Sequence, residues 1–169
     1  MRRHVISLFI VLGCLLAGSA QAAEIRFPKT GTTAFLINMP AGWTAKEDDY
    51  NGMQLLPADH RTSVYLSVVR DKDYAGKPLM ELALAIGKPS NITQFPKQEP
   101  AVISGRKGEA FYGQMNNANG LLLDVKMVII PLDPDLWATE TILSSQKLTA
   151  AQNAALNQAV RGVALTSGK

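Results

Sequence analysis

The stretch NNANGLLLDVKMVII, residues 116–130, decides the fold prediction. Its loop ends in Asn119-Gly120, a strong β-hairpin signal because both residue types tolerate positive φ. A strand over 121–130 follows, because its apolar residues alternate onto one face: Leu121, Leu123, Val125, Met127 and Ile129. Asp124 and Lys126 interrupt the opposite face, which is therefore predicted to be only partly buried.

Shorter apolar alternations surround this hairpin. They predict further strands at residues 34–39, 54–56, 63–70, 99–104, 107–115 and 136–144. Because most of these segments are separated only by short turns, neighbouring strands should pair as hairpins, and hairpins give an antiparallel sheet.

Two segments change from strand spacing to helical spacing. The first runs from Pro78 to Gly87, and its apolar residues fall at i, i+3, i+4 and i+7. The second opens with Thr149 and Gln152, a capping-box pattern. Its apolar stripe is rich in alanine: Ala155, Leu156, Ala159, Val160 and Val163. The predicted fold class is α+β, an antiparallel β-sheet of about six or seven strands packed with two helices.

The first 22 residues have the three parts of a secretory signal peptide. Arg2 and Arg3 give a positive start, residues 5–16 are mostly apolar, and Ala20-Gln21-Ala22 matches the small-residue cleavage pattern. The apolar part is shorter than the roughly 20 residues that cross a bilayer. We therefore expect residues 1–22 to be removed, with cleavage after Ala22 or Ala23. Residues 23–169 should then form a single domain that is periplasmic or secreted.

Cys14 raises an alternative for the same segment. Residues 11–14, Val-Leu-Gly-Cys, are similar to a bacterial lipoprotein signal, in which Cys14 would carry lipid and become the first mature residue. Leu12 is bulky where a small residue is usual, and the apolar region continues after the cysteine. We favour cleavage and a soluble domain, and expect membrane attachment only if Cys14 is lipidated.

The amino-acid composition excludes several classes of function. Removal of Arg2 and Arg3 leaves 15 basic against 14 acidic residues, without a dense basic cluster, so nucleic-acid binding is not expected. The predicted mature domain has one histidine, His60, and no cysteine. Cys–His catalysis and a zinc site with several Cys or His ligands are therefore excluded. The chain also lacks the familiar catalytic and nucleotide-binding motifs. We predict no metal site and no cofactor.

A family resemblance appears in the predicted strand that contains Phe35-Leu36-Ile37-Asn38-Met39-Pro40-Ala41-Gly42-Trp43. This strand, which runs into a Pro-x-Gly-Trp turn, resembles the opening of PsbP-like domains, and the order of elements after it is also similar to theirs. The group includes the DcrB-like proteins of bacteria and is known as the Mog–PsbP fold. The resemblance implies a sandwich of sheet and helices, without a shared catalytic site, in a binding, assembly or accessory protein.

Asp59-His60-Arg61 is the one compact cluster that joins a histidine, an acid and a base. Histidine titrates near neutral pH, so the cluster could serve as a general acid–base or anion-binding site. The plainer interpretation is a polar turn between two strands, because Pro57-Ala58-Asp59 is typical turn sequence.

Aromatic residues offer candidate contact surfaces. Trp43 is expected to cover one end of the core, whereas Tyr50, beside Asn51-Gly52, should lie in an exposed loop. The candidate binding residues are Trp43, Tyr50, Asp59, His60 and Arg61. We expect an exported, non-enzymatic binding or accessory protein whose partner is an envelope protein or a small ligand. The alternatives are a small periplasmic hydrolase that uses His60 and an envelope lipoprotein anchored at Cys14.

Overall fold

The structure is a computed structural model that describes residues 24–29, 34–48 and 52–166. The predicted signal peptide, Cys14 and Tyr50 lie outside these described residues. Within them, no helix is both long and apolar enough to cross a membrane.

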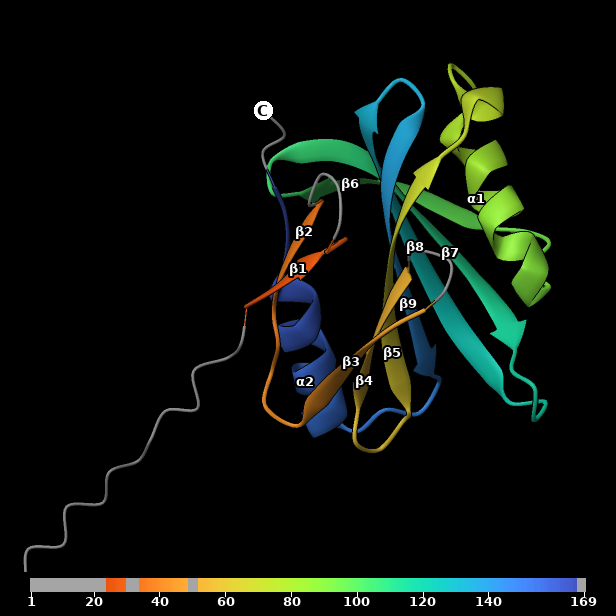
Figure 1. Cartoon of the computed structure of the whole chain (residues 1–169). Helices are drawn as coiled ribbons and strands as arrows, with labels where there is room; N and C mark the ends of the chain where they lie inside the picture. The colour runs from red at the N-terminus through yellow and green to blue at the C-terminus, as the bar shows by residue number, and fades with distance from the viewer. Residues whose placement is uncertain (1–23, 30–33, 49–51, 167–169) are drawn as a thin grey trace, which may run out of the picture.

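Seven strands form the central antiparallel sheet, in the spatial order β3-β4-β5-β9-β8-β7-β6. Figure 1 shows it between two outer layers. The strands are β3 (Trp43–Glu47), β4 (Gly52–Pro57), β5 (Thr62–Arg70), β6 (Lys97–Ile103), β7 (Arg106–Asn116), β8 (Leu122–Asp133) and β9 (Leu136–Ser145). Every neighbouring pair except β5–β9 is consecutive in the chain, so short turns generate most of the sheet.

Helix α1 (Leu79–Gly87) covers one face of this sheet, over β7 and β8. The other face is covered by a three-stranded sheet of β1 (Glu24–Phe27), β2 (Phe35–Asn38) and β10 (Val163–Leu165), together with α2 (Ala150–Arg161). Two further segments, Lys72–Tyr74 and Lys88–Ser90, form single 3-10 turns. The predicted α+β class is confirmed.

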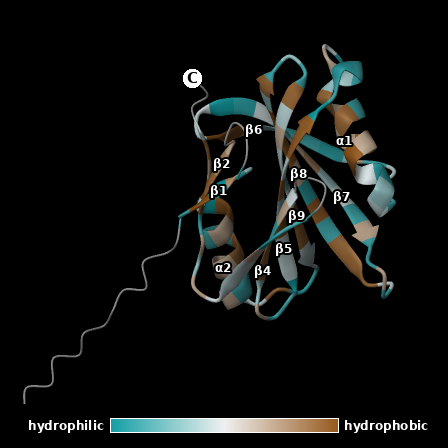
Figure 2. Ribbon diagram, in the orientation of Figure 1, coloured by the Kyte–Doolittle hydropathy of each residue, from teal (hydrophilic) through white to brown (hydrophobic). Residues whose placement is uncertain are grey.

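Two hydrophobic cores result, one on each face of the large sheet. Phe35, Ile37, Leu55 and Leu66 are fully buried between the two sheets, with Leu156 and Val160 of α2 against them. On the opposite face, Leu82 and Ala83 of α1 pack in a cluster with Phe111, Met127 and Ile129. Figure 2 shows the corresponding hydrophobic bands along the central strands and on α1.

The hairpin at residues 116–130 is confirmed, with a different turn geometry from the one expected. Only Gly120 adopts a positive φ, of 73°, while Asn119 does not. Asn117 organises the turn instead, because its side-chain oxygen accepts hydrogen bonds from the backbone N–H groups of Asn119 and Leu121, each at 2.9 Å. The turn is therefore stabilised by an asparagine side chain as well as by glycine.

The face of β8 that carries Asp124 and Lys126 is partly buried, as predicted. Val128 and Ile130 on this face are buried, whereas Lys126 and Asp124 near the hairpin are not. Val128 and Ile130 belong to the core between the two sheets, so on this face burial increases along the strand away from the hairpin.

Three short strands differ from the sequence prediction. Strand β1 lies directly after the predicted signal peptide, β3 begins at Trp43, which we expected to end a turn, and β10 contains Val163, which we expected in the last helix. The helix ends at Arg161, because Val163 to Leu165 pair with β2 as a strand. Its predicted capping box is confirmed: Thr149 and Gln152 exchange side-chain to backbone hydrogen bonds of 2.8 and 3.2 Å.

Candidate functional site

The turn between β4 and β5 holds the Asp59-His60-Arg61 cluster. His60 adopts a positive φ of 53°, and its backbone N–H donates to the Pro57 carbonyl at 3.1 Å. All three side chains of the cluster are exposed. The interpretation as a polar turn between two strands is confirmed.

Asp59 is engaged in holding this turn. Its carboxylate accepts hydrogen bonds from the backbone N–H of Arg61 at 3.1 Å and from the side-chain amide of Gln152 at 2.7 Å. These two hydrogen bonds lower the pKa of Asp59 below its ordinary value, the one from Arg61 contributing most. Because Gln152 also caps α2, Asp59 links the β4–β5 turn to the start of that helix.

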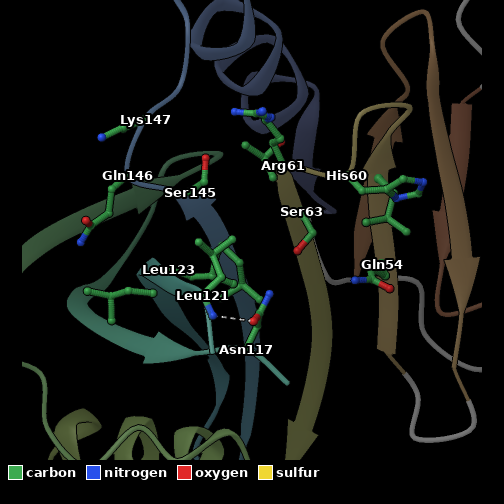
Figure 3. A pocket seen from close by; sticks show the side chains of 14 residues that line it. Gln54, His60, Arg61, Ser63, Asn117, Leu121, Leu123, Ser145, Gln146 and Lys147 are labelled. Carbon is green, nitrogen blue, oxygen red and sulfur yellow. Dashed lines mark hydrogen bonds between the residues drawn. The ribbon is translucent and has the colours of Figure 1, made fainter. Parts of the chain in front are cut away.

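The geometry does not assemble a hydrolase-type triad at this turn. A serine hydrolase needs an imidazole hydrogen-bonded to both a nucleophilic hydroxyl and a carboxylate. Among the described hydrogen bonds, none joins the His60 imidazole to Asp59 or to Ser63, the serine nearest to it in the sequence. In Figure 3 the His60 ring and the Ser63 hydroxyl point in different directions. Nor do the described residues include a cluster of three or more His, Cys, Asp or Glu side chains that could hold a metal ion.

Trp43 is partly buried and packs against the core beneath the small sheet. It lies at the start of β3, opposite Pro57 in the register of β3 and β4. The expectation that Trp43 covers part of the core is confirmed, and the residue does not lie among those that line the cavity described next.

A groove of about 710 Å³ lies at the ends of β4, β5 and β9, beside the β7–β8 hairpin. Five leucines form most of its apolar surface: Leu56, Leu121, Leu122, Leu123 and Leu143. Figure 3 shows Leu121 and Leu123 facing the same space as Ser63. Small and polar side chains complete the floor, among them Gln54, Ser63 and Ser145. We call this space the leucine groove.

The strand pairing explains why these residues meet. Ser63 lies opposite Leu143 where β5 pairs with β9, and Leu123 lies opposite Ser145 where β8 pairs with β9. Side chains alternate along a strand, so these residues share the face of the sheet that carries α1. Because α1 covers β7 and β8 farther along, this end of the face remains open.

Two of the groove leucines are unusually exposed for large apolar side chains. Leu121 is 53% exposed and Leu122 is 38% exposed. Scattered exposed leucines are common on protein surfaces, but a cluster that lines a concave space is typical of a binding site.

His60 and Arg61 line the edge of this groove together with Lys147. Two of the predicted site residues, His60 and Arg61, therefore lie at its margin, while Asp59 holds the turn behind them. The clustering of the five leucines was not predicted from the sequence. The run Leu121-Leu122-Leu123 directly after a hairpin turn was the available signal, since consecutive leucines cannot all face the core of a strand.

A second cavity, of about 640 Å³, lies at the edge of the sheet beside Tyr112, Lys97 and Asp124. Its charged groups are mostly engaged within the protein. Lys97 forms a 2.6 Å ion pair with Glu99 and lies 4.8 Å from the centre of the Tyr112 ring. Asp124 accepts a 3.0 Å hydrogen bond from Gln114. The leucine groove offers more unengaged surface, so it is the better candidate site.

Comparison with known proteins found no matching protein-family model and no relative among curated proteins. Solved structures do resemble the chain. The solution structure of the cyanobacterial PsbP protein CyanoP from Synechocystis matches with a TM-score of 0.58 at 8% identity, covering 88% of this chain and 96% of CyanoP. This domain has a PsbP-like fold. The predicted resemblance is therefore confirmed at the level of the fold.

The PsbP-like fold also relates the chain to LpqN, a protein involved in cell envelope biogenesis in Mycobacterium tuberculosis. That match has a TM-score of 0.54 at 16% identity and covers 86% of this chain and 90% of LpqN. A Bacteroides thetaiotaomicron structure matches with a TM-score of 0.51 at 12% identity over 79% of this chain. This chain spans only 45% of that protein. Identities this low establish the shared fold alone. They do not transfer a function, because one fold serves many functions.

Proposed function

We propose that this chain is an exported, periplasmic binding protein without enzymatic activity, and that it holds a ligand in the leucine groove. The observation that carries the proposal is the groove itself: a concave space of about 710 Å³ at the open end of a sheet face, with five leucines in its lining. Small-molecule sites are typically largely apolar cavities of about 300–1,000 Å³ with a few polar groups.

Three further observations support this function. The N-terminal pattern of residues 1–22 is that of a signal peptide. The only histidine of the predicted mature domain, His60, is exposed on a turn and makes no described hydrogen bond to Asp59 or Ser63. The PsbP-like neighbour LpqN is itself involved in envelope biogenesis, which fits an accessory role outside the cytoplasm.

Native mass spectrometry of the protein released from bacterial cells by osmotic shock tests the proposal. We expect a chain that begins at residue 23 or 24, with an additional non-covalent mass that denaturation releases. The double variant Leu121→Gln/Leu123→Gln should lose most of that added mass, because polar side chains in the groove weaken burial of an apolar ligand. His60→Ala should keep it.

Val102→Gln is the matched control, because Val102 is 64% exposed on β6 and lies outside the groove. It should retain the ligand. A wild-type spectrum without bound mass, or a ligand whose chemical structure changes during incubation with wild type but not with His60→Ala, would contradict the proposed function. Retention of the uncleaved N-terminus would contradict export.

A further inference from the structure

The leucine groove continues inward along the sheet. A smaller cavity, of about 290 Å³, shares the lining residues Gln54, Ser63 and Leu143 with the leucine groove, so the two spaces adjoin. The inner space lies under the C-terminal end of α1, where Ile86 and Gly87 contribute to its lining. We call these two adjoining spaces the trough; its lining extends from α1 to the ends of β4, β5 and β9.

The charge of the lining changes along this trough. Among the described residues, no charged side chain lines the inner space. Five of its lining side chains are large and apolar: Ile86, Ile92, Met115, Met127 and Leu143. The polar ones, Gln54, Ser63, Tyr65, Ser90 and Thr141, are uncharged. The outer end carries two cationic side chains, Arg61 and Lys147, with His60 beside them. Neither space has an aspartate or glutamate among its described lining residues.

The outer end also has unused hydrogen-bonding capacity. Within the described part of the chain, neither Arg61 nor Lys147 takes part in an ion pair. The Ser145 hydroxyl is buried and has no hydrogen-bond partner among the described residues. A buried hydroxyl without a partner is unfavourable, and a ligand oxygen at this position would satisfy it.

We propose that the trough binds a single-chain amphiphile with an anionic head group. The chain would lie along the leucines toward the inner space, and the head group would lie near Arg61, Lys147 and Ser145. This inference rests on the proposed function and adds to it the chemical class of the ligand. An uncharged interior that carries large apolar side chains, joined to a cationic mouth, complements a molecule with an apolar tail and a negative end.

A titration series with the full chain at neutral pH separates head-group from tail recognition. The probes are dodecanoate, dodecyltrimethylammonium and dodecyl maltoside, which share one chain but differ in charge, and butanoate, which has the anionic head without the long chain. All are used below micelle-forming concentrations, with calorimetry as the readout. Each methylene buried raises affinity by about fourfold, so dodecanoate should bind at least about a hundredfold more tightly than butanoate.

A separate variant, with its own control, tests whether the cationic side chains recognise the charge of the head group. Arg61→Gln/Lys147→Gln should weaken dodecanoate binding by about tenfold, the range expected for two solvent-exposed ion pairs. Binding of dodecyl maltoside should stay unchanged. Lys46→Gln/Lys107→Gln is the matched control, because both lysines are exposed and lie outside the trough. It should bind both probes like wild type.

The outcomes distinguish the two proposals. If the three dodecyl probes bind equally well and Arg61→Gln/Lys147→Gln changes nothing, the anionic head group is wrong while a ligand-binding groove stands. If Leu121→Gln/Leu123→Gln leaves dodecanoate binding unchanged, the groove is not the site and both proposals fail. The single variant Leu121→Gln serves if the double variant does not fold, because Leu121 is mostly solvent-exposed and its replacement perturbs packing little.

Discussion

Replacing Glu140 by glutamine is expected to raise the free energy of unfolding by about 3 kcal/mol at pH 8. Glu140 lies in β9 and is only 3% exposed. Its neighbours in the sheet register, Leu66 and Val128, are apolar. Burial raises the pKa of Glu140 from its ordinary 4.5 to about 7, although the positive charge of Lys126 opposes the shift.

The sign of this effect follows from the two protonation states. Between pH 4.5 and 7 the folded protein binds a proton at Glu140 that the unfolded chain has lost. The stability that this proton provides is therefore complete below pH 4.5 and is lost as the pH rises through 7. Glutamine resembles the neutral carboxyl group at every pH, so the variant should not lose stability over this range.

Urea unfolding of wild type and Glu140→Gln at pH 5 and pH 8 measures this difference. Wild type should become less stable at the higher pH, and the variant should not follow it. Glu81→Gln, on the exposed side of α1, is the control and should follow wild type. A pH dependence of the same size in wild type and in Glu140→Gln would show that Glu140 is ionised in the folded protein at neutral pH.

Replacing Phe35 by alanine is expected to destabilise the domain by about 3–5 kcal/mol. Phe35 is fully buried in β2, the middle strand of the small sheet, and its ring centre lies 6.3 Å from that of Phe27. It fills the core between the two sheets, so its removal leaves a cavity that the strands cannot close. The measurement is the midpoint of thermal or urea unfolding.

Leu36→Ala is the matched control in the same strand. Leu36 is only partly buried and points to the opposite face of β2, so its truncation should cost about 1 kcal/mol. If Phe35→Ala and Leu36→Ala had equal effects, the small sheet would not pack on the large one as described.

The main elements of the fold were predictable because their signals are local. The Asn119-Gly120 turn, the spacing of apolar residues from Pro78 to Gly87 and the pair Thr149 and Gln152 each identify an element within one short segment. The short strands β1, β3 and β10 were not predictable in this way. Three to five residues carry little periodicity, and such segments become strands through their partners in the sheet.

The leucine groove was not predictable for a related reason. Its lining comes from β4, the β4–β5 turn, β5, the β7–β8 hairpin and the end of β9, which are far apart in the chain. Only the pairing of β5 with β9, which joins strands from the two halves of the chain, brings Ser63 beside Leu143. By contrast, the chemistry of Asp59, His60 and Arg61 was visible in the sequence, while the role of Asp59 in contacting Gln152 required the structure.

The most direct test of the groove as the binding site is an amide NMR titration of the full chain with dodecanoate. We predict that the largest chemical-shift changes occur at residues that line the trough, above all Ser63, Thr141 and Leu143. The amides of α2 and of β6 should change little. Changes concentrated on α2, on β6 or on the N-terminal residues, with the trough unaffected, would contradict the claim that this domain works through the groove.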